Sequence, residues 1–209
     1  MKFTPVVSMT LAVMLLALSN TGFAADAAAG KSAYAVCAAC HGQQGEGNVA
    51  MNAPKLAGQE PWYIERQLAA FRDGLRGTAP GDTFGAQMRP MAMAVGDATA
   101  QANLIAYIAS LPDVEVPTTV AGDAAAGKSA YMVCAACHGQ NAEGNQQMGG
   151  PALAGQDDWY LVRQINNYKK GLRGYDPKDT FGMQMKPMAA TLATDKAVND
   201  VVAYINTLK

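Results

Sequence analysis

The chain has few residues with metal-binding or nucleophilic side chains: its 209 residues include two histidines and four cysteines. Four cysteines are too few for a disulfide scaffold of this length. The net charge is −1, so the sequence lacks the basic character that nucleic-acid binding needs. After the first 18 residues, no stretch approaches the ~20 apolar residues of a membrane span. These absences exclude a disulfide-built domain, a nucleic-acid-binding protein and a protein with several membrane spans.

The first 24 residues have the pattern of an export signal. Lys2 supplies the positive start, residues 6–18 form an apolar run, and Gly22 and Ala24 fit a small-x-small cleavage site. We therefore expect cleavage after Ala24 and a periplasmic mature chain. The alternative is an uncleaved leader, which would hold the chain at a membrane surface.

The remainder of the chain consists of two copies of one sequence. A shift of 97 positions aligns residues 26–112 with residues 123–209 without a gap, and about 50 of the 87 pairs are identical. A solenoid repeat is much shorter, whereas each copy is near the lower end of domain size. Two prolines prevent a continuous helix through the connection between the copies. The predicted organisation is a signal peptide (1–24), an N-terminal domain (25–111), a linker (112–122) and a C-terminal domain (123–209).

The spacing of apolar residues predicts an all-α fold, since neither copy has a sustained two-residue alternation. Asp26 and Asp123 are placed to cap the first helix of each copy. In the first copy, a second helix is expected from about Pro61 to Gly74 and a last helix from about Asp97. Between them, we expect a loop that carries a Met-Pro segment. Each domain is therefore predicted to contain three or four short helices.

Every cysteine and histidine lies in one motif that occurs twice, as CAACHGQQGEGN from residue 37 and CAACHGQNAEGN from residue 134. A Cys-x-x-Cys-His run is typical of c-type haem attachment. On a helical turn, cysteines three apart face the same side and can form thioethers to one porphyrin, and the next histidine can bind the iron. We therefore expect two covalently bound haem c groups, held by Cys37, Cys40, Cys134 and Cys137, with His41 and His138 as iron ligands.

Two other uses of these residues are disfavoured. A four-cysteine zinc site would have to join two separate repeats, and it would leave both histidines without a role. A thioredoxin-like dithiol needs a strand-helix-strand context that the pattern does not show.

The sixth iron position cannot be filled by histidine, because both histidines are used as proximal ligands. The remaining candidates are methionine, lysine, water or no ligand. Each copy places a Met-basic-Pro-Met segment after its histidine, and methionine suits an electron-transfer haem. We favour Met88 and Met185, with Met91 and Met188 as the next choices. The alternative is that these methionines only fill gaps around the porphyrin.

With CxxCH, P-x-LAGQ, a Met-x-Pro segment and a closing AYI helix, the chain resembles class I cytochromes c. Two such units behind an export signal resemble the dihaem cytochrome c4 family, and the resemblance covers nearly all of the mature chain. It implies two tandem class I domains that pack as a pseudo-twofold pair, each with His/Met-ligated haem. It also implies that the haem propionates lie near the domain interface.

The resemblance also assigns supporting roles. The proline whose carbonyl accepts a hydrogen bond from the proximal histidine corresponds to Pro54 and Pro151. A contact between the first and last helices corresponds to the pairs Gly30–Tyr107 and Gly127–Tyr204. The residues expected at the propionates or at the domain interface are Trp62, Tyr63, Arg66, Gln67, Trp159, Tyr160, Arg163 and Gln164.

These features predict an electron-transfer protein and not an enzyme. Iron with both axial positions filled is closed to substrate, a peroxidase needs an open iron, and a sulfur dehydrogenase with cysteine ligation needs a further cysteine. We expect a monomeric carrier that passes single electrons from respiratory donors to a terminal oxidase or similar acceptor, with redox proteins such as a membrane cytochrome complex as partners. The alternatives are a permanently bound subunit of a larger oxidoreductase and, less favoured, a dihaem peroxidase.

Overall fold

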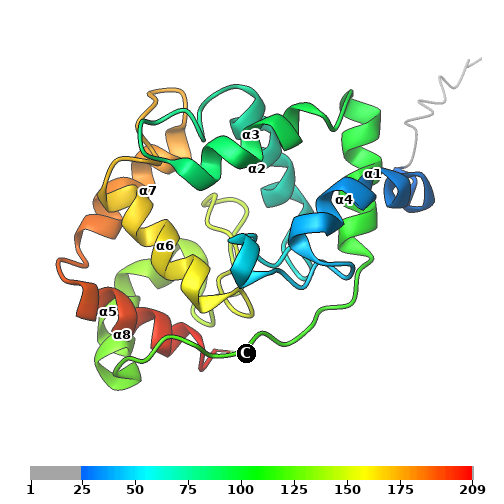
Figure 1. Ribbon diagram of the computed structural model, residues 1–209. Coiled ribbons are helices and arrows are strands. Elements are labelled where there is room, and N and C mark those ends of the chain that lie inside the picture. The colour runs from blue at the N-terminus through cyan, green and yellow to red at the C-terminus, as the bar shows by residue number, and fades with distance from the viewer. Residues whose placement is uncertain (1–24, 209) are drawn as a thin grey trace, which may run out of the picture.

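The computed structural model describes residues 25–208, so the predicted leader over residues 1–24 lies outside the described residues. The described chain forms two similar sets of four α-helices, which confirms the all-α prediction (Figure 1). None of its helices combines the length and apolar character needed to cross a membrane. The first set is α1 (Ala27–His41), α2 (Pro61–Arg72), α3 (Thr83–Met93) and α4 (Ala98–Ala109), with a short 3-10 helix η1 (Val49–Met51); the second is α5 (Ala124–His138), α6 (Asp158–Lys169), α7 (Thr180–Ala190) and α8 (Asp195–Ile205).

The first helix of each set begins as the sequence predicts, and it ends at a glycine. The carboxylate of Asp26 accepts hydrogen bonds from the first free N–H groups of α1, and Asp123 does the same for α5. Gly42 ends α1 with a φ of 85°, a conformation that glycine adopts without steric cost. The CxxCH motif therefore forms the last turns of α1 and α5.

Each set of helices has its own core, where the first helix crosses the last. Gly30 permits this crossing in the first set, because a Cβ there would lie 1.9 Å from the carbonyl oxygen of Asn103. Gly127 permits it in the second set, with the same distance to the oxygen of Asp200. The buried residues of the first core are Tyr34, Ala38, Ile64, Leu68, Phe71, Ala92, Leu104, Ile105 and Ile108; those of the second are Tyr131, Ala135, Ala142, Leu161, Leu192, Val198, Val201, Val202 and Ile205.

The prediction that the Met-Pro segment is a loop is wrong. Met88 lies within α3, and the equivalent Met185 lies within α7. Asp82 caps α3 with its side chain, and Pro90 removes only one backbone donor from the helix. The carbonyl of Pro90 still accepts a hydrogen bond from Ala94, so the helix continues past the proline.

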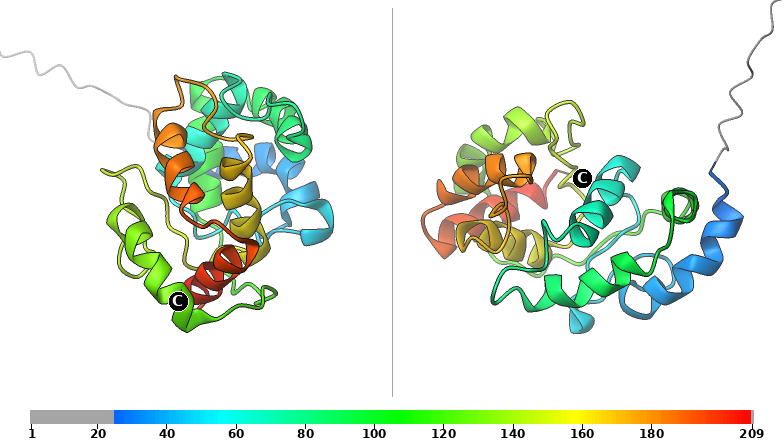
Figure 2. Two further views of the ribbon diagram at one scale, coloured as in Figure 1. Left: turned by 90° about the vertical axis from the view of Figure 1, so that its left-hand side faces the viewer. Right: turned by 90° about the horizontal axis from the view of Figure 1, so that it is seen from above.

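The two sets face each other across an interface to which α2 and α6 contribute, and the connecting segment runs along the outside from α4 to α5 (Figures 1 and 2). Asp158 holds the end of this segment. Its buried carboxylate accepts hydrogen bonds from the backbone and hydroxyl of Thr119, the backbone of Val120 and the amide of Asn206.

Candidate haem sites

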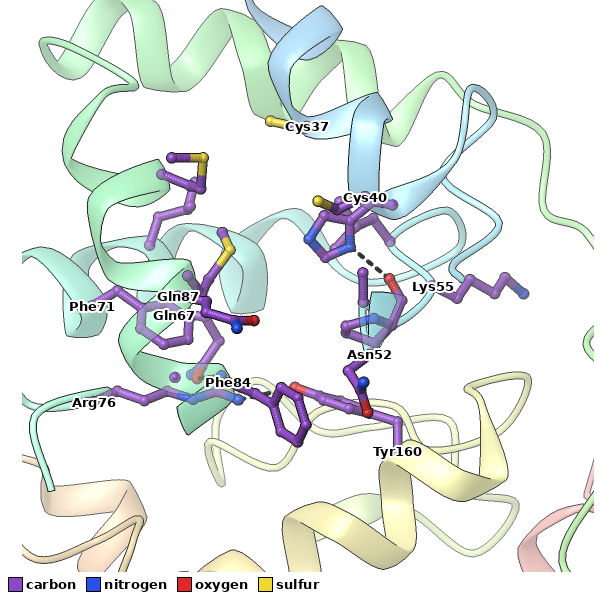
Figure 3. A pocket seen from close by; sticks show the side chains of 18 of the residues that line it. Cys37, Cys40, Asn52, Lys55, Gln67, Phe71, Arg76, Phe84, Gln87 and Tyr160 are labelled. Atoms are coloured by element: carbon purple, nitrogen blue, oxygen red, sulfur yellow. Dashed lines mark hydrogen bonds between the residues drawn. The ribbon is translucent and has the colours of Figure 1, made fainter. Parts of the chain in front are cut away.

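The last turns of α1 present the CxxCH side chains to one mostly apolar cavity. Cys37, Cys40 and His41 line this cavity together with Met88 of α3 and side chains of α2 (Figure 3). Counted with its open mouth, the cavity contains about 1180 Å³ of free space. The structure thus brings together all four residues that the sequence selects in the first domain.

The imidazole of His41 is oriented by the backbone. Its Nδ1 donates a 2.7 Å hydrogen bond to the carbonyl oxygen of Pro54, drawn as a dashed line in Figure 3. Burial lowers the pKa of His41, so the ring is neutral near pH 7. A neutral ring that holds its proton on Nδ1 has its lone pair on Nε2, which is the form that binds a metal.

The second domain repeats this arrangement at its own histidine. His138 donates from Nδ1 to the oxygen of Pro151 over 2.7 Å, and burial again lowers the pKa of the ring. Cys134 and Cys137 precede it on the last turns of α5. The proline role implied by the resemblance is therefore present in both domains.

The four cysteines are half-buried, and no disulfide joins them. Burial raises the pKa of Cys37, and it raises the pKa of Cys134 to about 11. Redox-active dithiols instead have a lowered pKa, because the thiolate is the reactive form. Cys37 and Cys134 therefore do not have the electrostatic environment of a thioredoxin-like nucleophile.

The two candidate methionines of each domain differ in burial. Met88 is half-buried and packs against the first core, whereas Met91 also lines the cavity but is 43% exposed. In the second domain, Met185 is half-buried and Met188 is 45% exposed. The burial pattern favours Met88 and Met185 over their neighbours as internal ligands.

The far wall of the first cavity is built by the other domain. Tyr160, Arg163 and Gln164 of α6 line the cavity opposite the cysteines, and Figure 3 shows Tyr160 on that side. Arg163 donates hydrogen bonds to the side chain and backbone of Asn52, at 2.9 and 2.8 Å. Of the eight residues that the resemblance places at the propionates or the interface, five form hydrogen bonds across the interface: Arg66, Gln67, Tyr160, Arg163 and Gln164. Tyr63 lines the cavity, whereas Trp62 lies at a separate pocket between α2 and α4.

Two buried arginines lie at the centre of the interface. Arg76 donates to Gln67, to Tyr160 and to Gln164, and Arg173 donates to Gln164 and Gln67. Burial acts to raise the pKa of Tyr160, but the nearby Arg76 and Arg173 outweigh burial, and the net pKa is lowered. Within residues 25–208, neither guanidinium forms an ion pair with a carboxylate.

These polar groups fit a flat apolar cofactor that has acidic substituents. Buried cations are costly unless an anion compensates them, and Arg76 and Arg173 have only neutral partners. Arg163 lines the cavity and has a buried Nε without a hydrogen-bond partner. Thiols, a free imidazole nitrogen, apolar walls and unpaired cations together match the vinyl groups, iron, ring and propionates of haem.

The contacts across the interface occur in reciprocal pairs. Arg66 donates to the oxygen of Gly149 and lies over the ring of Phe181, and the equivalent Arg163 donates to the oxygen of Asn52 and lies over Phe84. Adding 97 to the residue numbers of one member of each contact gives the corresponding residue of the other contact, so the two sets of contacts are related by the repeat. This reciprocity is the property of an isologous, twofold interface, as expected for a pseudo-twofold pair of domains.

Sequence reasoning missed several interface residues. Arg76 and Arg173 lie in the repeated GLRG motif, whose recurrence was a signal without an assigned role. Glu60 and Asp157 precede α2 and α6, where each would be interpreted as a helix cap. Neither side chain caps its own helix, because both reach across to the other domain.

Known proteins resemble the chain in both sequence and structure. A family model described as cytochrome c matches it twice, over residues 27–112 and 124–209. The chain is 34% identical over 215 residues to cytochrome c4 of Azotobacter vinelandii, which covers 95% of this chain and 98% of that protein. It is 32% identical over 181 residues to a thiosulfate dehydrogenase electron acceptor of Stutzerimonas stutzeri, covering 80% and 76%. The crystal structure of reduced recombinant cytochrome c4 from Pseudomonas stutzeri matches with a TM-score of 0.66 at 30% identity, covering 87% of this chain and 98% of that one.

Proposed function

Because the chain belongs to the dihaem cytochrome c4 family, we propose that it is a periplasmic one-electron carrier between respiratory donors and a terminal oxidase or similar acceptor. Family membership also means that it carries two covalently bound haem c groups. The observation that carries the proposal is the buried histidine of each domain, neutral and held through Nδ1, directly after two half-buried thiols.

When bound, each haem supplies a one-electron ferric/ferrous couple. The cysteines of each motif are proposed to hold the porphyrin, and the proximal histidine and one methionine are proposed to fill both axial positions. Pro54 and Pro151 fix the orientation of each imidazole, so the ligand set needs little rearrangement between oxidation states. The proposed residues are Cys37, Cys40, His41 and Met88 in the first domain, and Cys134, Cys137, His138 and Met185 in the second.

The proposed partners are redox proteins. A similar protein is named an electron acceptor of thiosulfate dehydrogenase, which supports a role in which electrons arrive from another protein. We propose that the carrier is a monomer without an enzymatic activity of its own. The two axial ligands proposed above would deny a substrate access to iron, which is the basis for proposing that the carrier has no enzymatic activity.

The axial ligands can be tested with matched methionine substitutions. Met88→Ala should remove about half of the weak far-red absorption that Met-ligated ferric haem shows. It should also lower the reduction potential of one haem and let the ferrous form of that haem bind carbon monoxide. Met91→Ala, three residues further along the same helix, is the control and should leave the far-red absorption and the resistance to carbon monoxide unchanged. The pair Met185→Ala and Met188→Ala should give the same result for the other haem.

The outcomes separate the ligand assignment from the carrier function. If Met91→Ala removes the absorption and Met88→Ala does not, the assignment within α3 is wrong but a Met-ligated carrier remains. If the wild-type protein contains one haem, or if both ferrous haems readily bind carbon monoxide, the proposed carrier function fails.

A further inference from the structure

The peptide unit that orients each proximal histidine also contacts a carboxylate of the opposite domain. His41 donates from Nδ1 to the oxygen of Pro54, at 2.7 Å. The N–H of that same peptide bond belongs to Lys55, and it donates to Oδ2 of Asp157 over 2.8 Å. Asp157 lies in the second domain and is 7% exposed. One peptide group thus connects the imidazole of one domain to a buried carboxylate of the other.

The second domain contains the reciprocal connection. His138 donates to the oxygen of Pro151 at 2.7 Å. The N–H of that peptide bond belongs to Ala152, and it donates to both carboxylate oxygens of Glu60, at 3.1 and 3.0 Å. Glu60 belongs to the first domain and corresponds to Asp157 under the repeat. The same chain of hydrogen bonds therefore crosses the interface twice, in opposite directions.

Two glycines leave the space for this connection. Gly47 has a φ of +84°, and a Cβ there would lie 2.7 Å from the nitrogen of Lys55 and 2.8 Å from Oδ2 of Asp157. The equivalent Gly144 has a φ of +87°, and its Cβ would lie 2.2 Å from Oε1 of Glu60 and 2.6 Å from the nitrogen of Ala152. A larger residue at either position would disturb the bond between amide and carboxylate.

We propose that Glu60 and Asp157 are positioning residues that tune the proximal histidine of the opposite domain, an inference that rests on the proposed function. Hydrogen bonds in a chain polarise one another, so a carboxylate that accepts from the peptide N–H makes the peptide oxygen a stronger acceptor. A stronger acceptor draws the Nδ1 proton and makes the imidazole a more electron-rich ligand, as a carboxylate does for metal-bound histidine. An electron-rich ligand favours ferric over ferrous iron.

The test uses isosteric neutral variants of the protein with both haems bound. Glu60→Gln and Asp157→Asn keep an acceptor oxygen but remove the charge. The chain has two histidines, so labelling with ¹⁵N-histidine gives one Nδ1–H signal for each haem in the diamagnetic ferrous protein. Glu60→Gln should move the signal of His138 and leave that of His41 in place. Asp157→Asn should do the opposite.

The redox equilibrium should follow the same crossed pattern. At a fixed applied potential, each variant should raise the ferrous-to-ferric ratio of the haem in the opposite domain by about threefold to tenfold, and tenfold corresponds to 59 mV for one electron. Gln59→Ala and Gln156→Ala are the controls. These side chains donate across the same interface, to the oxygens of Ala152 and Lys55, and accept from the backbone N–H groups of Glu60 and Asp157. Their removal leaves both carboxylates and both orienting peptide N–H groups in place. The two controls should move neither histidine signal.

The result that overturns the proposal is an unchanged pair of signals, or a shift of both signals in either variant, which would indicate a general change in charge or packing. If one variant does not fold, the other tests the same connection in the opposite direction. Failure of the proposed function is seen separately, because a wild-type protein without two haems and two hydrogen-bonded axial histidines would contradict that function before any variant is made.

Discussion

The crossing of α1 and α4 makes Gly30→Ala a sharp test of the packing that supports the first haem site. A Cβ at residue 30 would lie 1.9 Å from the backbone oxygen of Asn103 and 2.9 Å from the Cβ of Tyr107, whereas ordinary contact begins at 3.4 Å. Both neighbours belong to a helix and cannot rotate away. The two helices would therefore have to separate by most of the difference between the 1.9 Å distance and the 3.4 Å of ordinary contact.

The magnitude follows from two opposing effects. Overpacking a core costs about 1–3 kcal/mol and occasionally more, and contact with backbone belongs at the upper end of that range. Alanine regains about 1 kcal/mol of helix propensity over glycine. The expected net loss is about 2 kcal/mol, which lowers the midpoint of thermal unfolding by roughly 8–16 °C for a domain of this size.

Calorimetry of the haem-loaded protein measures this effect. Ala29→Gly, at the exposed neighbouring position of the same helix, should cost only the propensity difference of about 1 kcal/mol. Gly127→Ala should reproduce the loss in the second domain, where the Cβ distance to the oxygen of Asp200 is also 1.9 Å. A midpoint for Gly30→Ala at or above that of the wild type would refute the close crossing of α1 and α4.

Three further predictions concern stability. Leu104→Ala should cost about 2–5 kcal/mol in the free energy of unfolding, because Leu104 is 1% exposed in the first core; a calorimetric loss below 1 kcal/mol would contradict that burial. Asp158→Ala should cost about 1–3 kcal/mol in urea unfolding, because the backbone donors of Thr119 and Val120 lose their acceptor, and an unchanged urea midpoint would show that this anchor contributes nothing. Burial acts to raise the pKa of Asp158, but the hydrogen bonds from Thr119 and Val120 outweigh it and the net pKa lies below 3.8. The stability that Asp158 contributes is therefore complete above pH 3.8 and is lost as the pH falls through the lower folded-state pKa. In acid, the urea midpoint of Asp158→Asn should consequently depend less steeply on pH than the urea midpoint of the wild type. Equal slopes would refute the assignment.

Local sequence patterns predicted the parts of this protein that depend on local interactions. The caps at Asp26 and Asp123 and the all-α character follow from a few neighbouring residues and were confirmed. The two haem groups follow from CxxCH, whose spacing has one dominant chemical use. The Met-Pro segment was predicted to lie in a loop, but Pro90 removes only one hydrogen bond from a helix that Asp82 caps, so the segment is helical.

The interface could not be predicted in the same way, because its partners lie about a hundred residues apart and carry no local signal. Glu60 and Asp157 occupy the N-cap positions of α2 and α6, and only the three-dimensional structure shows that their carboxylates bond to the other domain. Arg76 and Arg173 belong to a repeated motif to which the sequence assigned no role, yet both are buried. The roles of the iron ligands stay predictions of the sequence that the geometry supports.

The repeat makes the two haem sites similar, but one buried cation makes them unequal. Lys55 is 3% exposed, whereas its counterpart under the repeat is Ala152. The ammonium of Lys55 pairs with Asp113 of the connecting segment and donates to the oxygen of Gly155 in the second domain. Lys55 also supplies the peptide N–H beside Pro54, so this charge lies on the residue next to the carbonyl that orients His41. The charge lies on the first domain's copy of the orienting peptide and is absent from the second copy. The same set of proposed ligands would therefore lie in different electrostatic fields, and Lys55 would give the two haems a structural reason to differ.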